Sequence, residues 1–202
     1  MTIHSGCAAA ALAAASLSGA LQEPGAAAES VYTRIHDCLL IEEPLDIPVA
    51  ISACPGHEGT AVLLAGGDHG SAVAFGTRGH EAQFAEAPPR TGPLLGPGEV
   101  IEWRVADGAA YATILRWFAS DYENEIVGNW LVVTALRPEG EVTACQVAYV
   151  DALSLAEANA LAREVADRIA PRFSCGEDLP VRFDAGSPDL ETVLAGWQAR
   201  PR

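Results

Sequence analysis

The stretch Tyr111-Ala-Thr-Ile-Leu-Arg-Trp-Phe118 carries the clearest strand signal in the chain. From Thr113 to Trp117 polar and apolar residues partly alternate, as expected of a strand with one wet face and one covered face. Similar alternation occurs just upstream, in Glu102-Trp103-Arg104-Val105. The β-branched and aromatic content of both stretches predicts neighbouring strands of an antiparallel sheet.

Further short runs rich in Val, Ile, Leu and Ala lie on both sides of this pair, and turn sequences separate them. The turn sequences include Pro55-Gly56, Gly66-Gly67-Asp68, Asp107-Gly108 and Pro138-Glu139-Gly140. The predicted strands are 38–41, 49–53, 60–65, 71–75, 100–105, 111–118, 130–136 and 142–150. This spacing predicts an antiparallel β meander. A long irregular loop is expected over 81–98, where prolines and glycines accumulate.

One helix is expected after the last of these strands. Ser154-Leu-Ala-Glu157 has the spacing of a capping box, in which the serine hydroxyl and the glutamate each satisfy a backbone amide. Leu161, Val165 and Ile169 then recur at every fourth position and form an apolar stripe, before Pro171 ends the pattern. The sequence therefore predicts a helix over 155–170 and an α+β fold.

The tail from Asp184 allows two interpretations. Its glycine, serine and proline residues are typical of a frayed terminus, whereas its apolar residues have helical spacing. These apolar residues are Leu190, Val193, Leu194 and Trp197.

An apolar, Ala-rich run over 7–21 has the length of an export signal and is too short to span a membrane. Small residues suited to cleavage end at Ala20 and again at Ala28, and the second site is favoured because domain-like sequence starts at Glu29. A lipoprotein signal ending at Cys7 is the alternative, although His4 stands where a small aliphatic residue belongs. We expect a signal peptide over 1–28 and one globular domain over 29–202, periplasmic or secreted from a Gram-negative bacterium.

Four cysteines follow the signal, an even number that favours disulfides in an oxidising compartment. We expect Cys38 to pair with Cys54 and Cys145 to pair with Cys175, because each pair brackets a local unit. The first unit is a strand pair, and the second is a strand followed by the predicted helix. The other two connectivities remain open, and a zinc site is the rival, although no Cys-x-x-Cys pair is present.

The chain of 202 residues has 27 acidic residues against 12 basic ones, a formal net charge of −15. Removing 1–28 deletes one acid, Glu23, and leaves 26 acids against 12 arginines. Such a surface repels nucleic acids and anionic lipid headgroups, so we expect no nucleic-acid partner. We also expect no integral membrane segment in the mature chain, because the apolar run over 7–21 is too short to span a membrane and is removed with the signal. A cationic protein or ligand is the partner class that this charge favours. Asp121, Glu123 and Glu125 form one short acidic cluster.

A metal or acid–base site could be built from His57, Asp68 and His69, provided that their two glycine-rich turns converge. The spacing matches no established metal motif. The chain has no Gly-x-Ser-x-Gly elbow, and it has no lysine for a Ser-x-x-Lys nucleophile. We therefore assign no catalytic residue and expect no cofactor.

Several motifs resemble a family of uncharacterised exported proteins of alphaproteobacteria, over residues 29 to 180. The matching motifs are Cys54-Pro55-Gly56-x-x-Gly59, Ile101-Glu102-Trp103-Arg104, 112–118, 131–134, Cys145-x-x-Ala148-Tyr149-Val150-Asp151-Ala152, Asn159-x-x-Ala162-Arg163 and Cys175. The resemblance implies export and the same cysteine placement, and it transfers no catalytic residue.

Two functional interpretations follow from the sequence. The first is a non-enzymatic periplasmic binding or accessory protein of unknown ligand, since no catalytic signature accompanies the disulfides and the acidic surface. The alternative is a small hydrolase or metal-dependent enzyme that uses His57, Asp68 and His69.

Overall fold

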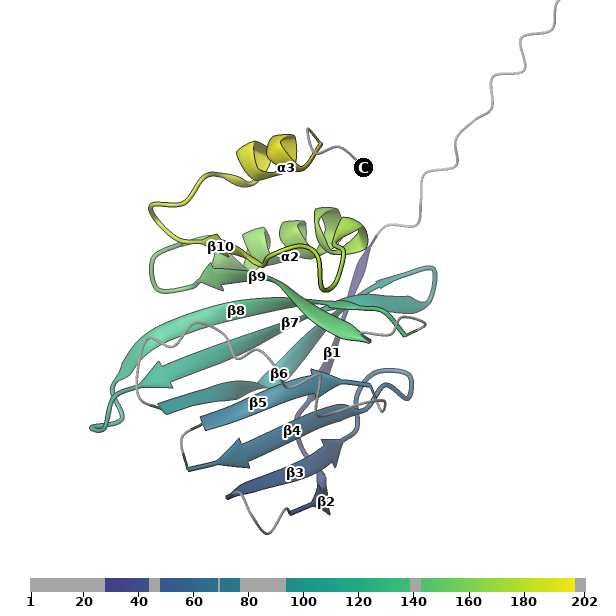
Figure 1. Ribbon diagram of the computed structural model, residues 1–202, viewed down its shortest axis with the longest axis vertical. Coiled ribbons are helices and arrows are strands. Elements are labelled where there is room, and N and C mark those ends of the chain that lie inside the picture. The colour runs from purple at the N-terminus through teal and green to yellow at the C-terminus, as the bar shows by residue number, and fades with distance from the viewer. Residues whose placement is uncertain (1–27, 44–47, 69, 77–93, 139–142, 199–202) are drawn as a thin grey trace, which may run out of the picture.

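A computed structural model of the chain describes residues 28–43, 48–68, 70–76, 94–138 and 143–198 (Figure 1). The strands are β1 (Glu29–Arg34), β2 (Leu39–Glu42), β3 (Val49–Cys54), β4 (Val62–Gly67), β5 (Gly70–Phe75), β6 (Leu94–Ala106), β7 (Ala109–Ser120), β8 (Ile126–Leu136), β9 (Ala144–Asp151) and β10 (Val181–Phe183). The helices are α2 (Ala158–Arg168), a short 3₁₀ helix η1 (Ala170–Arg172) and α3 (Leu190–Gln198).

The strands form two sheets instead of one continuous meander. One sheet has six strands in the order β1-β6-β7-β8-β9-β10, and the other has four in the order β2-β3-β4-β5. All neighbouring strands are antiparallel except β10, which runs parallel to β9. Each of the eight predicted strands is present, whereas β1 and β10 were not predicted. The predicted loop over 81–98 is wrong over 94–98, because β6 begins at Leu94, and its part over 81–93 lies outside the described residues.

The six-stranded sheet is buried on both faces. In β8, Leu131 and Val133 contact the cluster that contains the helices, while Trp130 and Val132 contact the cluster that contains the second sheet. The predicted wet face of the central strands is therefore wrong. Strand β8 has apolar side chains on both faces, since helices cover one face of the sheet and the four-stranded sheet covers the other.

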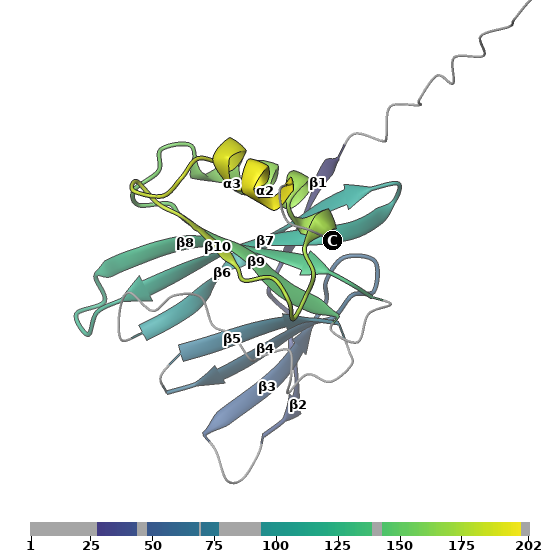
Figure 2. The same ribbon diagram turned by 45° about the horizontal axis from the view of Figure 1, so that its top comes forward.

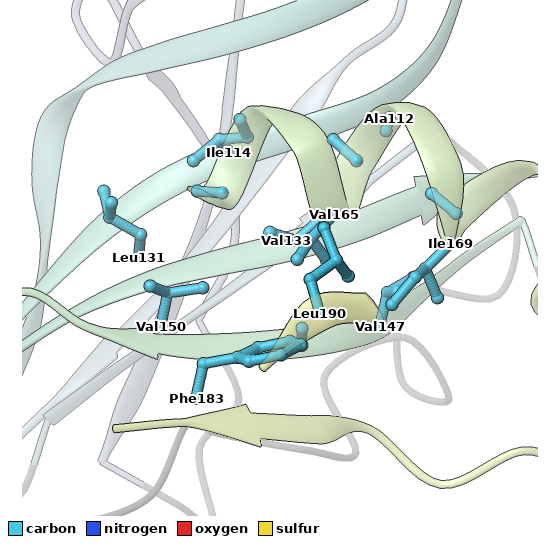
Figure 3. Packing of buried hydrophobic residues seen from close by; sticks show 14 of the residues in the cluster. Ala112, Ile114, Leu131, Val133, Val147, Val150, Val165, Ile169, Phe183 and Leu190 are labelled. Atoms are coloured by element: carbon cyan, nitrogen blue, oxygen red, sulfur yellow. The ribbon is translucent and has the colours of Figure 1, made fainter. Parts of the chain in front are cut away.

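The helices cover one face of the six-stranded sheet in both views of the ribbon (Figures 1 and 2). Val165 of α2 and Ile169, which directly follows α2, lie against Val133 of β8 and Val147 of β9 (Figure 3). Phe183 of β10 closes the same cluster. The apolar stripe predicted for the helix is thus the face that packs on the sheet.

The four-stranded sheet crosses the other face. At one end of β5, Gly70 approaches Leu95 of β6 so closely that a side chain at this position would meet the Leu95 carbonyl at 3.0 Å. At the other end, Thr143 just before β9 donates a hydrogen bond to the Phe75 carbonyl at 3.3 Å. Strand β5 therefore crosses from β6 to the start of β9, and Trp103, Trp117 and Trp130 fill the space between the sheets.

The predicted capping box does not form. Helix α2 begins at Ala158, and Glu157 makes no side-chain hydrogen bond to the helix end. The Ser154 hydroxyl instead accepts a hydrogen bond from the backbone amide of Ala185, at 3.2 Å. Asp151 holds the entry to the helix, because its carboxylate accepts from the Leu153 amide at 2.9 Å. The contact between Ser154 and Ala185 thus replaces the capping box, although the sequence has the spacing of that motif.

The tail after Asp184 forms a helix, so the described residues contain a second α-helix in addition to the predicted one. Leu190 and Leu194 of α3 are buried in the helix-side cluster. Asp189 caps the helix by accepting from the Thr192 amide at 2.8 Å. Arg168 of α2 forms an ion pair with Glu191 of α3, so the two helices also contact each other through charge.

Both predicted disulfides are present. Cys38 is bonded to Cys54, 16 residues away, and Cys145 is bonded to Cys175, 30 residues away. The first joins the start of β2 to the end of β3. The second joins β9 to the segment that follows η1, so it closes a loop that contains α2. Within the described residues, none of the helices has the length and apolar character that crossing a membrane requires.

The Cys145–Cys175 disulfide should stabilise α2 selectively. In the protein comprising residues 29–202, replacing both cysteines by serine should lower the free energy of unfolding by about 3–4 kcal/mol, because the unfolded chain loses a closed loop of that size. Hydrogen exchange over 158–168 should accelerate more than exchange in β7 and β8. The matched control replaces Cys38 and Cys54 by serine, which should loosen β2 and leave α2 protected. Unchanged exchange over 158–168 in the first variant would contradict this role.

Candidate functional site

Two residues of the predicted metal site, His57 and Asp68, are not brought together. His57 lies in the turn before β4, with its ring 5.9 Å from that of Trp103, whereas Asp68 lies in the turn after β4. A strand of six residues is about 20 Å long, so the two side chains stand at opposite ends of it. His69 lies outside the described residues. Among the residues that the structure describes, no group of three His, Cys, Asp or Glu side chains could hold a metal ion.

A buried network of charges joins β6 to α2 instead. Arg104 donates two hydrogen bonds to Asp167, from Nε to Oδ1 at 2.8 Å and from Nη2 to Oδ2 at 2.7 Å. Tyr111 of β7 donates to the same Oδ1 at 2.5 Å. The guanidinium of Arg104 is almost fully buried and Asp167 is about one-third exposed. Such paired, charge-assisted bonds fix both the position and the rotation of the helix.

A second pair runs alongside the first. Arg163 of α2 donates to Glu102 of β6, from Nε to Oε1 at 2.6 Å and from Nη2 to Oε2 at 3.2 Å. Ser30 of β1 connects the two pairs, because its hydroxyl donates to Glu102 at 2.6 Å and accepts from Arg104. Glu102 and Arg104 are two residues apart and so lie on one face of the strand. Their partners on α2 are four residues apart and so lie on one face of the helix.

The network shifts the pKa values of its members. Burial disfavours the Asp167 carboxylate, but hydrogen bonds from Arg104 and Tyr111 outweigh it and hold the pKa of Asp167 below its ordinary value. Burial, together with the hydrogen bond to Asp167, raises the pKa of Tyr111 to about 12. The hydrogen bond to Glu102 raises the pKa of Arg163. Each acid of the network is hydrogen-bonded to an arginine, so the network acts as a structural clamp between β6 and α2.

Strand β2, at the edge of the four-stranded sheet, has a run of exposed apolar residues. Leu39, Leu40 and Ile41 follow one another, and they are 73%, 58% and 51% exposed. On the inner side β2 pairs with β3, whereas no described strand pairs with its outer side. Edge strands present unpaired backbone N–H and C=O groups, and natural proteins usually place charges there to block pairing. Here three apolar side chains accompany that edge.

The edge is held in place before any partner arrives. The Cys38–Cys54 disulfide fixes its N-terminal end to β3. The register with β3 shifts between Leu40 and Glu42, so Ile41 occupies a bulge. A bulge bends an edge strand and limits the length that can pair. A partner strand therefore meets a short, rigid edge.

A groove of about 530 Å³ adjoins the same disulfide. Its lining includes Tyr32 and Arg34 of β1, the following His36, and Pro55 and Gly56 after β3. His36 and Pro55 are close in sequence to Cys38 and Cys54, so the groove opens at the N-terminal end of β2. Arg34 forms an ion pair with Glu99 at 3.2 Å, and Nδ1 of His36 lies 2.7 Å from the Asp37 carboxylate.

The acidic cluster predicted at 121–125 is the tight turn between β7 and β8. The Asp121 carboxylate accepts from the backbone amides of Glu123 and Glu125, both at 2.9 Å, so it holds the turn. Glu123 and Glu125 are exposed beside Tyr122, which is also exposed. The cluster therefore contributes two carboxylates to the acidic surface and one to local structure.

Sequence patterns gave a partial signal for these features. Glu102 and Arg104 are two residues apart, as on one face of a strand, and Arg163 and Asp167 are four apart, as on one face of a helix. The acid comes first in one pair and the base comes first in the other, so each charge can meet its opposite. This is the sequence signal for the clamp. The run Leu39-Leu40-Ile41 predicts a strand, but its exposure depends on sheet order, which the run does not encode. Comparisons of the chain with protein-family models, with curated proteins and with solved structures find no match.

Removing one partner of the clamp should destabilise the protein. Asp167→Asn leaves the buried Arg104 guanidinium without its carboxylate and should lower the free energy of unfolding by about 3 kcal/mol at pH 7. Because the pKa of Asp167 is lowered by folding, its contribution is present above about pH 4 and is lost as pH falls through the lower folded value. The difference between variant and wild type should therefore shrink on acidification, as measured by urea unfolding from pH 7 to pH 2.

The matched control is Glu164→Gln on the same helix. The Glu164 side chain is 61% exposed and lies 4.0 Å from Arg168, so its loss should cost less than about 0.5 kcal/mol. Equal effects of the two substitutions would contradict the assignment of the clamp.

Proposed function

We propose that this protein is a non-enzymatic binding or accessory protein of a bacterial envelope, periplasmic or secreted, and that β2 is its binding edge. In this mode an extended segment of the partner adds one strand to the sheet, so backbone hydrogen bonds supply affinity and side chains supply specificity. The observation that carries the proposal is the run of three exposed apolar residues, Leu39 to Ile41, on an edge strand.

The disulfide beside the edge supports a binding role. A rigid edge loses little conformational freedom when a partner strand adds to it, and this lower cost favours affinity. Cys38–Cys54 and the ladder to β3 supply that rigidity. The groove at the N-terminal end of β2 gives room for the continuing partner chain or for one of its side chains.

Two disulfides also support an oxidising compartment. The apolar run over 7–21 supports export into it. No observation in the structure favours the alternative, a hydrolase or metal-dependent enzyme built on His57, Asp68 and His69.

The compartment can be tested on the full chain expressed in a Gram-negative host. The periplasmic or secreted form should begin near Glu29, and its intact mass should be four hydrogens below that of the reduced chain, since two disulfides remove four thiol hydrogens. Mass spectrometry before and after reduction measures both. A form recovered outside the cytoplasm that has two or more titratable thiols would overturn this part of the proposal.

Strand addition can be tested with a short synthetic peptide, Gln-Thr-Val-Ile-Val-Thr-Gln. Its binding should slow hydrogen exchange at backbone amides of β2 and leave β8 unchanged. The matched control is the same peptide with alternate backbone nitrogens methylated, which keeps the side chains and removes the donors for the ladder. Protection by the methylated peptide equal to that by the parent would show that the edge does not bind through its backbone.

A further inference from the structure

We infer that the end of the six-stranded sheet beside the start of α2 contains a second binding site, which takes a carboxylate attached to an apolar group. Arg116 of β7 holds the carboxylate, and the side-chain amides of Asn129 in β8 and Asn159 in α2 stand beside it. Strands β7 and β8 extend past the start of α2 at this end of the sheet (Figures 1 and 2). The site lies on a different sheet from β2, so it is independent of strand addition.

Arg116 reaches two neutral acceptors instead of an acid. Its Nη1 donates to Oδ1 of Asn129 at 2.7 Å, and its Nη2 donates to Oδ1 of Asn159 at 3.0 Å. Nε of Arg116 and the Nδ2 groups of both asparagines donate to no residue that the structure describes. Because a guanidinium has more donors than these two, the amides fix its orientation and leave donors for a further ligand.

The charge of Arg116 has no carboxylate to balance it. The pKa values of Arg104 and Arg163 are raised by hydrogen bonds to acids, whereas burial lowers the pKa of Arg116. Asp151, at the end of β9, directs its carboxylate to the backbone amide of Leu153, at 2.9 Å. A partly buried charge without a counter-ion is unfavourable, and an anion that binds beside it offsets this cost.

The start of α2 has the same polarity as Arg116. Glu157, just before the helix, makes no side-chain hydrogen bond to the helix end, and no acid stands in the first turn. The amides of this turn carry a partial positive charge, and Asn159 belongs to it. The helix end is not a site by itself, but its field favours an anion at Arg116.

Phe118 gives the site an apolar surface. Arg116 and Phe118 are two apart on β7 and so lie on one face of the strand. A side chain added at Gly98 would meet Cβ of Arg116 at 3.6 Å and the ring of Phe118 at 3.5 Å, so both flank the same point of β6. Gly96, which pairs with Phe118, has no described neighbour within 4 Å of its missing side chain. The ring therefore borders a groove, of about 300 Å³.

The charge balance selects a singly charged ligand. The site has one guanidinium, and the chain over 29–202 has 26 acids against 12 arginines. A phosphate, with about two negative charges at neutral pH, is repelled more strongly by this field than a carboxylate is. A carboxylate also accepts two parallel hydrogen bonds from a guanidinium. Asp68 lines the groove, so the carboxylate faces Arg116 and the apolar group lies against Phe118.

The test uses small ligands and NMR of the isotope-labelled protein comprising residues 29–202. Phenylacetate should shift the side-chain signals of Arg116, Asn129 and Asn159. Phenylacetamide has the same shape without the charge and should bind about ten-fold more weakly, because the charge-assisted hydrogen bonds are lost. Phenyl phosphate should also bind more weakly than phenylacetate.

A chain terminus and a free acid offer the same chemistry, and acetyl-Gly-Gly-Phe separates these two sources. Tighter binding of this peptide than of phenylacetate would support the site and identify the C-terminal carboxylate of a peptide as its ligand. Weaker binding of the peptide than of phenylacetate would support the site for a small carboxylic acid.

A matched pair of variants separates the site from the overall charge. Asn159→Asp places a carboxylate beside Arg116 and should weaken phenylacetate binding by about ten-fold or more, while an acid in the first turn keeps the fold stable. Ala160→Asp adds the same charge at the next, exposed position of the helix and should change the affinity by less than about two-fold.

Three outcomes would overturn the inference. The first is equal loss of binding in the two variants, since overall charge would then explain it. The second is binding of phenylacetamide as tight as that of phenylacetate, and the third is tighter binding of phenyl phosphate. None of these results bears on β2, which is tested with a strand-forming peptide, so failure of this site and failure of the proposed function are distinguishable.

Discussion

The six-stranded sheet must be covered on both faces, and the rest of the architecture follows from this constraint. Strand β8 directs Leu131 and Val133 to one side and Trp130 and Val132 to the other. Helices α2 and α3 and strand β10 cover the first face, and the four-stranded sheet covers the second. The inter-sheet face of the second sheet contributes Val62 and Phe75 to this core, and its outermost strand, β2, remains at an edge.

The helix-side face is not apolar throughout, and its polar part determines how α2 sits on the sheet. Apolar contacts between Val165, Ile169 and the sheet would tolerate a small sliding or rotation of the helix. The bidentate contact between Arg104 and Asp167 does not, because its two hydrogen bonds require one geometry. The buried charges therefore supply position, while the apolar stripe supplies most of the burial.

The sequence predicts local elements well and their partners less well. Alternation and turn residues locate the strands, and the cysteine spacing predicts both disulfides, because these features depend on short segments. The capping box fails since Ser154 finds a tertiary partner in Ala185. The clamp and the exposure of Leu39 to Ile41 depend on sheet order, which sets the neighbours of each residue. The metal site fails for the same reason: β4 separates the turns that contain His57 and Asp68.

The pairing of β1 with β6 has a consequence for the time course of folding. Ser30 and Glu102, which are hydrogen-bonded across these strands, are 72 residues apart in the chain. The helix-side core also needs Leu190 and Leu194, near the other end of the described residues. Contacts between residues so far apart in sequence form slowly, because the entropy cost of closing a large loop comes before the free energy gained from the contact. We therefore expect the native core to close late in folding, after the local hairpins have formed.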